Sequence, residues 1–367
     1  MSRINGLDLL RAAAMLMGVL LHALVLYLEP EDGSEPLVWV GVLFLWIHNW
    51  RMPLFFMLAG FFAALTLDRK SPSAFSWDRL YRIGFPIGLW WFIVAPIPLW
   101  SALREGTDLP ALDHLWFLYY LLLMYAAAVV IRPFVPQQIV SIVDLSLRSR
   151  WTLLLWAIPI TAFSVMGRDN GLFNVHPEFI GEIEVGFFFF SLTFFCLGWR
   201  LFYHQNLFSS FANLRWSIAA LSIAMVALLA ALATWLALEE ELSSLAALLW
   251  VNGLSSCATL LSILGLMGLC LKRVAEPSAR LRFWVEVSYP IYFFHALVVF
   301  SLGDFFLNAS WPAFGAIFVN TVASTAVSIL LYFIFIRYTP LGWMFMGYKN
   351  AWFRWSKLRW FFSRQNS

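Results

Sequence analysis

The chain has 367 residues, of which 62% are hydrophobic and only 12% are charged, and its formal net charge at pH 7 is +3. A soluble globular domain carries about a quarter charged residues, so this composition excludes a soluble enzyme. It indicates a chain that lies mostly in the lipid bilayer, with no nucleic-acid partner expected.

A membrane crossing needs about 20 consecutive apolar residues per helix, and apolar runs of roughly that length recur along the whole chain. The sequence therefore predicts an all-α, polytopic membrane protein with about ten transmembrane helices. They are expected near residues 7–27, 37–67, 82–101, 115–131, 152–166, 185–203, 215–237, 246–271, 284–302 and 312–338. Residues 1–343 form the predicted transmembrane domain, and residues 344–367 form a basic, aromatic tail.

The distribution of basic residues predicts the orientation, because cytoplasmic loops are enriched in Lys and Arg. If the N-terminus is cytoplasmic, 20 of the 24 Lys and Arg residues fall on that side, and most Asp and Glu residues fall in the opposite loops. Both termini are therefore predicted to be cytoplasmic, in a bacterial inner membrane that the chain crosses several times. The tail fits an interfacial helix on an anionic leaflet and equally a flank that ends the last crossing.

The cysteines indicate neither a disulfide framework nor a metal site. Cys196, Cys257 and Cys270 lie inside or at the ends of predicted spans and form no CxxC pair. No metal ligands are therefore assigned.

The first span carries ionisable side chains, which cost several kcal/mol within a bilayer unless they face a partner or a cavity. Asp8, Arg11 and His22 lie in this one span. The step of eleven residues from Arg11 to His22 is three helical turns plus about 20°, with about 16 Å of rise. Both side chains should therefore share one face of the helix.

The second span contains His48 and Arg51, which are three residues apart and hence neighbours on a helix. Pro53 follows and can open the helix, which is tolerated at this depth only beside a cavity or packed protein. This set predicts an aqueous or ligand-filled cleft.

Arg79 and Arg82 precede the third span at the cytoplasmic side, one helical turn apart. Two guanidinium groups at that spacing can hold a phosphate group. Ordinary positive-inside charge is the alternative interpretation, and this pair alone does not decide between the two.

Two further spans carry histidines. His114 and Trp116 begin the fourth span, where an aromatic belt explains the tryptophan but not the histidine, and Tyr292 and His295 lie in the ninth. A single intramembrane histidine is usually a packed, hydrogen-bonded group, but histidines in several spans together with two arginines favour a site. The histidines in loops, at positions 176 and 204, receive no role.

These residue types fit acyl transfer. A neutral histidine is the commonest general base for a hydroxyl proton, and cytoplasmic arginines could hold a phosphorylated donor. No GxSxG, HExxH or Walker motif occurs in a suitable context, which disfavours a serine hydrolase, a zinc protease or an ATP-driven pump.

Several segments resemble the acyltransferase family 3 membrane enzymes, in the family's order along the chain. They are Leu-Asp-Leu-Leu before Arg11 with His22 eleven residues on, His48-Asn-Trp-Arg-Met-Pro-Leu-Phe-Phe, Arg79 and Arg82 with Pro86, His114-Leu-Trp-Phe-Leu, and Tyr292 with His295. Within that family, the second and fourth segments are most similar to the glucan biosynthesis protein C group, which succinylates periplasmic glucans.

The resemblance implies a transferase that moves an acyl group from cytoplasmic succinyl-coenzyme A or acetyl-coenzyme A, with no bound cofactor, to a sugar hydroxyl of a periplasmic glucan. His22, Arg11 and His48 are the expected catalytic residues, with His22 as the base that acts either directly or through a covalent acyl relay. Arg51, Arg79, Arg82, His114, Trp116, Tyr292 and His295 are the expected substrate-binding residues. Arg51 is assigned to a succinyl carboxylate because it is a cation at membrane depth.

Some features depart from the family or stay open. Ala59 and Gly60 stand where relatives often carry Ser-Gly. Some relatives append a soluble periplasmic domain, and none is expected here. An O-acetyltransferase for another surface polysaccharide, a transporter or flippase, and a structural scaffold are the alternatives. A homo-oligomer is one possible state of the chain, and the sequence leaves the oligomeric state open.

Overall fold

The structure is a computed structural model that describes residues 4–28, 37–93, 112–167, 177–238, 244–274, 276, 278–309, 311–347 and 351–353. Within these residues the regular secondary structure is helical and includes no β-strand. Helices satisfy the backbone N–H and C=O groups inside their own segment, which the hydrocarbon of a bilayer requires. The all-α fold predicted from the sequence is confirmed.

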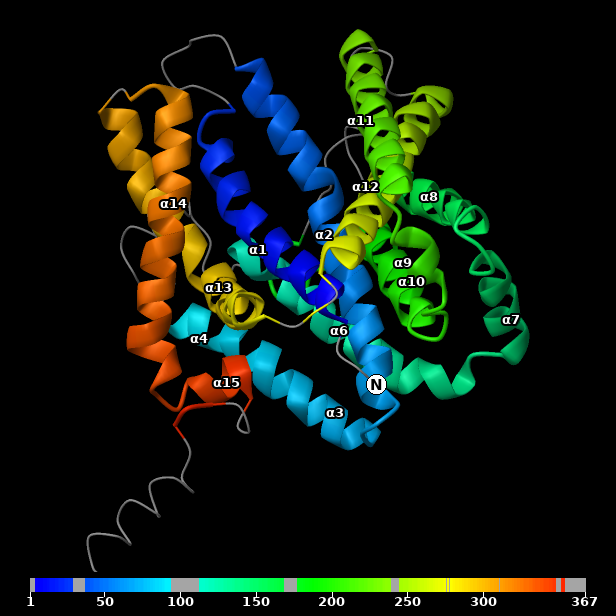
Figure 1. The fold of residues 1–367 in the computed structure, drawn as a ribbon, viewed down its shortest axis with the longest axis horizontal. Coiled ribbons are helices and arrows are strands. Elements are labelled where there is room, and N and C mark those ends of the chain that lie inside the picture. The colour runs from blue at the N-terminus through cyan, green and yellow to red at the C-terminus, as the bar shows by residue number, and fades with distance from the viewer. Residues whose placement is uncertain are drawn as a thin grey trace, which may run out of the picture. The chain divides into compact units, whose positions relative to one another are not determined.

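The elements follow the chain in a simple order (Figure 1). They are α1 Asn5–Val25, α2 Val38–Leu67, α3 Pro72–Arg79, η1 Leu80–Gly84, α4 Phe85–Ile93, η2 Asp113–Leu115, α6 Trp116–Ile131, η3 Arg132–Phe134, α7 Gln137–Ser146, η4 Thr152–Trp156, α8 Ala157–Gly167, α9 Val185–Leu201, α10 Leu207–Phe211, α11 Leu214–Ala237, α12 Leu245–Arg273, α13 Ala279–Asn308, α14 Ala313–Leu331, η5 Tyr332–Arg337 and α15 Gly342–Met346.

Seven of the described helices are long and apolar enough to cross a membrane, and two apolar helices are shorter. The seven are α1, α2, α6 with η3, α11, α12, α13, and α14 with η5; the shorter two are η4 with α8, and α9. The chain is therefore a polytopic membrane protein. The predicted span at 82–101 begins as η1 and α4, and its second half lies outside the described residues.

The short span at 152–166 begins as a 3₁₀ helix, Thr152–Trp156, before it continues as α8. A 3₁₀ helix rises about 2.0 Å per residue and an α-helix about 1.5 Å. Residues 152–167 therefore extend roughly 26 Å, which approaches the thickness of a bilayer core of about 30 Å.

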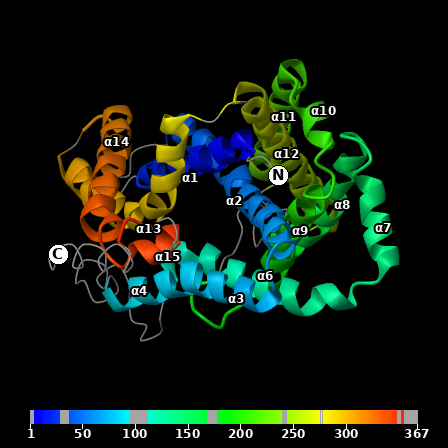
Figure 2. The same ribbon diagram turned by 60° about the horizontal axis from the view of Figure 1, so that its bottom comes forward.

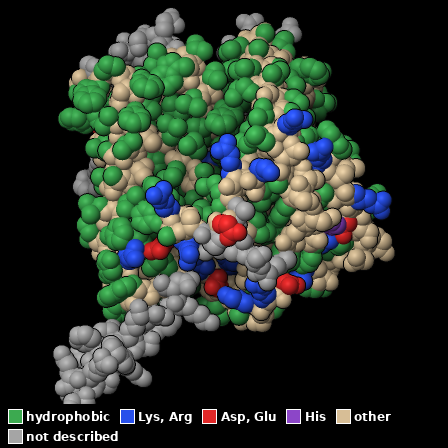
Figure 3. Space-filling view, viewed as in Figure 1, with side chains coloured by type: hydrophobic (Ala, Val, Ile, Leu, Met, Phe, Trp, Pro, Cys, Tyr) green, Lys and Arg blue, Asp and Glu red, His purple; other side chains and the backbone are tan. Residues whose placement is uncertain are grey.

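On the face seen in Figure 3, hydrophobic side chains cover the upper part of the view, and the Lys and Arg side chains of the described residues gather in its middle and lower parts. The cytoplasmic position of both termini stays a prediction. Most of the predicted tail, residues 344–367, lies outside the described residues.

The chain divides into two compact units. Unit 1 consists of Met1–Ala14, Val42–Ser76 and Leu109–Ser278. In it α11 and α12 lie side by side, α8 packs on both α9 and α12, and α10 packs on α12 (Figures 1 and 2). One buried cluster joins Leu45, Leu228 and Ala258 from three different helices.

Unit 2 consists of Met15–Gly41, Trp77–Asp108 and Ala279–Ser367. In it α13 and α14 lie side by side, and α15 packs on η1, η5 and α13 (Figure 2). The ring of Phe293 packs against Trp90 at 5.4 Å and against Phe345 at 5.4 Å between ring centroids. These contacts hold α4, α13 and α15 together.

Within unit 1, α2 and α9 touch through backbone atoms at two glycines. A Cβ atom added at Gly60 would overlap the carbonyl oxygen of Phe195, and one added at Gly198 would overlap the carbonyl oxygen of Met57. Small residues at a helix interface permit this close approach in membrane proteins.

We expect Gly60→Ala to lower the free energy of unfolding by about 2 kcal/mol, since the added methyl group forces the two helices apart. Thermal unfolding in detergent measures the effect. Gly41→Ala, also in α2, is the matched control because nothing lies within 4 Å of a Cβ atom there. Equal melting temperatures for both variants would contradict the predicted role of Gly60.

Candidate active site

Arg11 is held in unit 1 by a carboxylate and an aromatic ring. Its Nη2 lies 3.3 Å from Oδ1 of Asp8, a buried residue, and its guanidinium carbon lies 5.6 Å from the centre of the Phe62 ring. The helix that carries Arg11 continues without interruption to His22. The helical spacing expected for these two residues is therefore present.

His22 pairs with His295 in unit 2. Their ring centroids lie 5.0 Å apart, with the two ring planes tilted by 51°. His295 is 1% exposed, and its partner comes from a segment far away in the sequence. The structure thus brings together two of the predicted site residues on α1 and α13.

The backbone fixes the tautomer of His295. Its Nδ1 lies 2.7 Å from the carbonyl oxygen of Tyr292 and 3.2 Å from that of Ile291. A carbonyl oxygen only accepts hydrogen bonds, so Nδ1 carries the proton and Nε2 is the basic nitrogen of the neutral ring. This is an orientation in which an imidazole can take part in proton transfer.

Aromatic rings surround the histidine pair. The ring of Tyr292 lies 5.8 Å from that of His295, and the ring of Phe300 lies 5.8 Å from that of His22. Tyr292, predicted as a binding residue, is thus beside the pair. Its own carbonyl also orients His295.

In α2, His48 stacks on Phe44, with ring centroids 5.3 Å apart and an interplanar angle of 23°. Arg51, one turn further along, is 7% exposed. Burial of a charged side chain at membrane depth is costly and is typical of functional positions. Both residues lie in unit 1.

Asn49, between these two residues, joins α2 to α12. Its Oδ1 accepts hydrogen bonds from Oγ of Ser255 at 3.0 Å and from Oγ1 of Thr259 at 2.9 Å, and its Nδ2 donates to the carbonyl oxygen of Ser255 at 3.3 Å. The three groups are buried. They fix the rotation of α2 about its axis and thereby the direction of His48 and Arg51.

Pro53 explains a second contact of Thr259. Proline has no backbone N–H and therefore cannot bond the carbonyl four residues earlier, which here belongs to Asn49. Oγ1 of Thr259 lies 3.3 Å from that carbonyl oxygen, which is one of the acceptors that its single proton can reach. A hydroxyl from a neighbouring helix thus lies within hydrogen-bond distance of the carbonyl that Pro53 releases.

We expect Thr259→Val to lower the free energy of unfolding by about 1 kcal/mol more than Thr234→Val, which is the size of a good interhelical hydrogen bond in a membrane. Both hydroxyls bond a carbonyl in their own helix, at Ser255 and Ala230 respectively, but Thr259 alone of the two also bonds Asn49. Thermal unfolding of the two variants measures the difference, and identical values would refute the role given to Asn49.

Trp116 has a packing role. Its ring centroid lies 5.2 Å from that of Phe187 and 6.4 Å from that of Phe56, so it joins α6 to α9 and α2. His114 precedes it in η2 and is half-buried. The two predicted binding residues therefore lie at the start of α6, in unit 1.

Arg79 and Arg82 do not lie on one regular α-helical turn. Arg79 ends α3, and Arg82 lies in η1, a π-helix whose wider turn rotates each residue less about the axis. Nη2 of Arg82 donates to the carbonyl oxygen of Phe345 at 3.4 Å, and the Tyr289 hydroxyl donates to the carbonyl oxygen of Arg82 at 2.8 Å. Nε of Arg79 lies 3.9 Å from Asp78.

Sequence reasoning missed a polar cluster in unit 2. The Tyr332 hydroxyl donates to Oε1 of Glu286, and Nη1 of Arg337 lies 3.4 Å from the same oxygen. A carboxylate at the start of the ninth predicted span was the available signal. The cluster joins α13 to η5.

It also missed a cluster at the end of α7. Arg200 donates three hydrogen bonds to the carboxylate of Asp144, and Nε2 of His204 lies 3.0 Å from Oδ1 of Asp144. Burial alone would raise the pKa of Asp144, but the bonds and charges of Arg200 and His204 outweigh it and lower that pKa. The ion pair therefore stabilises the fold at neutral pH and loses its effect as the pH falls through the lowered pKa.

Within the described residues, no group of three or more His, Cys, Asp or Glu side chains is placed to hold a metal ion. Proton transfer and charge stabilisation by His and Arg side chains are the chemistry that the described arrangement offers.

Comparison with known proteins identifies the family. Residues 4–361 match the family model described as "Acyltransferase domain" (Acyl_transf_3). The chain belongs to acyltransferase family 3.

Among the relatives of this family 3 chain are two proteins named "Glucans biosynthesis protein C". The one from Escherichia coli O81 (strain ED1a) is 25% identical over 386 residues, which cover 93% of this chain and 94% of the relative. The one from Escherichia coli O139:H28 (strain E24377A / ETEC) is 25% identical over 388 residues, with the same coverage. No solved structure matches the chain. The resemblance predicted from the sequence is confirmed, and the protein is a membrane acyltransferase.

Proposed function

We propose that the protein is an O-acyltransferase of the bacterial inner membrane that moves an acyl group, succinyl in the first instance, from cytoplasmic acyl-coenzyme A to a sugar hydroxyl of a periplasmic glucan. The name of its relatives supports the glucan acceptor. The observation that carries the chemistry is the contact between the rings of His22 and His295 in a chain of an acyltransferase family.

In the proposed reaction, His22 takes the proton of the sugar hydroxyl, and the oxygen attacks the carbonyl carbon of the thioester. The C–S bond then breaks, and the thiolate of coenzyme A takes the proton from the His22 imidazolium. The products are a sugar ester and free coenzyme A thiol. His295, whose proton lies on Nδ1, borders His22 and orients its ring.

The arginines bind the donor and stabilise charge on it. Arg11, held by Asp8, stabilises charge on the donor, and Arg79 and Arg82 bind phosphates of coenzyme A. Arg51, a buried cation beside His48 in the sequence, pairs with the succinyl carboxylate. His48 serves as a second proton-transfer group.

We expect His22→Gln to lower the rate of acyl transfer about 100-fold or more, since this is the usual contribution of a general base. Purified protein receives succinyl-coenzyme A and a periplasmic-type glucan, and free thiol and glucan mass are followed together. Melting temperature in detergent reports whether the variant is folded.

His204→Gln is the matched histidine control. His204 bonds Asp144 through Nε2, and a glutamine amide nitrogen can donate the same bond, so transfer should continue at the wild-type rate. If folded wild-type protein releases no thiol with succinyl or acetyl donors, acyl transfer from coenzyme A is refuted. A transporter, which moves its substrate without consuming a thioester, then takes its place.

We expect Arg51→Gln to lower the rate with succinyl-coenzyme A about tenfold relative to the rate with acetyl-coenzyme A, because only the succinyl group carries a carboxylate for a charge-assisted pair. The ratio of the two rates cancels any general loss of folded protein. An unchanged ratio would remove Arg51 from donor recognition.

A further inference from the structure

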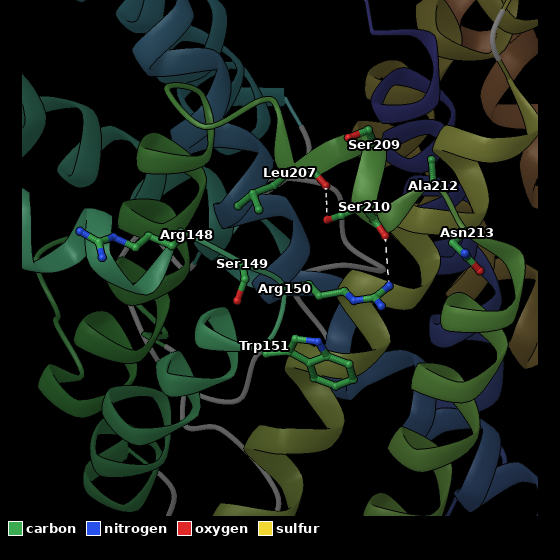
Figure 4. A pocket seen from close by; sticks show the side chains of 9 residues that line it. All are labelled: Arg148, Ser149, Arg150, Trp151, Leu207, Ser209, Ser210, Ala212 and Asn213. Carbon is green, nitrogen blue, oxygen red and sulfur yellow. Dashed lines mark hydrogen bonds between the residues drawn. The ribbon is translucent and has the colours of Figure 1, made fainter.

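A pocket of about 510 Å³ opens on unit 1 between the α7–η4 connection and the α10–α11 connection (Figure 4). It takes no part in the proposed acyl transfer. Its polar lining is made of Arg148, Ser149, Arg150, Ser209, Ser210 and Asn213, and none of its lining residues is acidic. The nearest carboxylate in the sequence, Asp144, is already paired with Arg200. The pocket is therefore electropositive.

Two tryptophans hold Arg150 at this pocket. Its guanidinium carbon lies 5.2 Å from the ring centre of Trp151 and 4.9 Å from that of Trp216. Figure 4 shows the side chain extended towards α10, where Nη1 donates to the carbonyl oxygen of Ser210 at 3.4 Å. A guanidinium has five N–H donors. Among the described residues this hydrogen bond uses one of them, so the others can serve a ligand.

The turn that carries Arg150 is itself fixed. The backbone N–H of Ser149 donates to Oγ1 of Thr152 at 3.1 Å, and the backbone N–H of Thr152 donates to Oγ of Ser149 at 3.2 Å. Arg148 lies on the other side of this turn and extends away from Arg150 (Figure 4). Arg150 is thus the preorganised cation of the pocket, and Arg148 adds charge at its rim.

The helices that follow the pocket-lining segments in the sequence carry exposed apolar side chains. Ile158 of α8 is 68% exposed, and Ile218 of α11 is 54% exposed. In α11, only 28% of the most apolar window is buried inside the protein, so this helix presents a broad surface to lipid. Asn213, which lines the pocket, directly precedes α11, so the pocket lies at the end of a helix that presents apolar side chains to lipid. Trp151, which is exposed, fits an interfacial depth.

We propose that this pocket binds the phosphate of an anionic phospholipid headgroup of the phosphatidylglycerol class. The Arg150 guanidinium holds the phosphate oxygens, and the acyl chains lie along the exposed faces of α8 and α11. A basic pocket at the end of a lipid-facing helix suits a lipid phosphate, whereas a soluble phosphate ester would gain nothing from the exposed apolar faces of α8 and α11. The positive-inside prediction places this pocket at the cytoplasmic leaflet.

The test uses the full chain purified in detergent, with dioctanoyl phosphatidylglycerol and dioctanoyl phosphatidylcholine as probes. A ligand that binds the folded state raises the melting temperature with its concentration. We expect phosphatidylglycerol to raise the melting temperature of the wild type more than phosphatidylcholine does. We expect Arg150→Gln to need about tenfold more phosphatidylglycerol for the same rise in melting temperature, because the variant loses one charge-assisted contact.

Arg132→Gln is the matched control. Arg132 also lies over a tryptophan, with its guanidinium carbon 5.8 Å from the Trp199 ring centre, and it follows α6. The Arg132→Gln variant removes the same charge without changing a residue of the pocket lining, and it should respond to lipid like the wild type. If Arg150→Gln does not fold, Arg150→Lys, which keeps the charge and loses the planar fork, should show an intermediate loss of lipid response.

Three outcomes would overturn the proposal. The first is that Arg132→Gln and Arg150→Gln lose the same part of the stabilisation by phosphatidylglycerol, which would mean that the lipid is attracted by the general positive charge of the protein. The second is equal stabilisation by the two lipids. The third is that phosphatidylglycerol has no effect, whereas inorganic phosphate or coenzyme A stabilises the protein in a way that depends on Arg150. That result would assign the pocket to a soluble phosphate ester.

Discussion

A polar group inside hydrocarbon must find its partner within the protein, and the described helices are held together at points where this requirement is met. Asn49 bonds Ser255 and Thr259 of another helix, and Ser164 bonds Asn252 in the same way at 2.7 Å. In unit 2, Asn320 donates to the carbonyl oxygen of Val299. Each pair fixes two helices in rotation as well as in distance. The bonds of Asn49 thereby set the directions of His48 and Arg51 on either side of it in α2.

The candidate catalytic groups are positioned by aromatic rings as well as by hydrogen bonds. Arg11 lies over Phe62, His48 stacks on Phe44, and the histidine pair borders Tyr292. A ring restricts the position of a cation or an imidazole without consuming its hydrogen-bonding atoms. Aromatic packing thus adds to the hydrogen bonds that Arg11 makes with Asp8 and His295 makes with the carbonyl of Tyr292.

The sequence was sufficient for the helical architecture and for the local relations within a helix, such as that of Arg11 to His22. Apolar length and periodicity carry this information, and a short apolar helix occupies residues 152–167, where a span at 152–166 was predicted. Contacts between distant segments were beyond it: nothing in the sequence says that His22 meets His295, or that Thr259 lies within hydrogen-bond distance of the carbonyl released by Pro53. The π-helix at Arg82 also escaped prediction, because the residues in it would fit a regular α-helix equally well.

The glycine contact between α2 and α9 limits how this chain can change during evolution. At both Gly60 and Gly198 the atom that excludes a side chain is a backbone carbonyl oxygen of the opposite helix. Every amino acid has that oxygen, so no second substitution on the partner helix can make room for a side chain at either glycine. Genetic suppressors of changes at these positions should therefore be rare and should arise at distant sites that shift a whole helix.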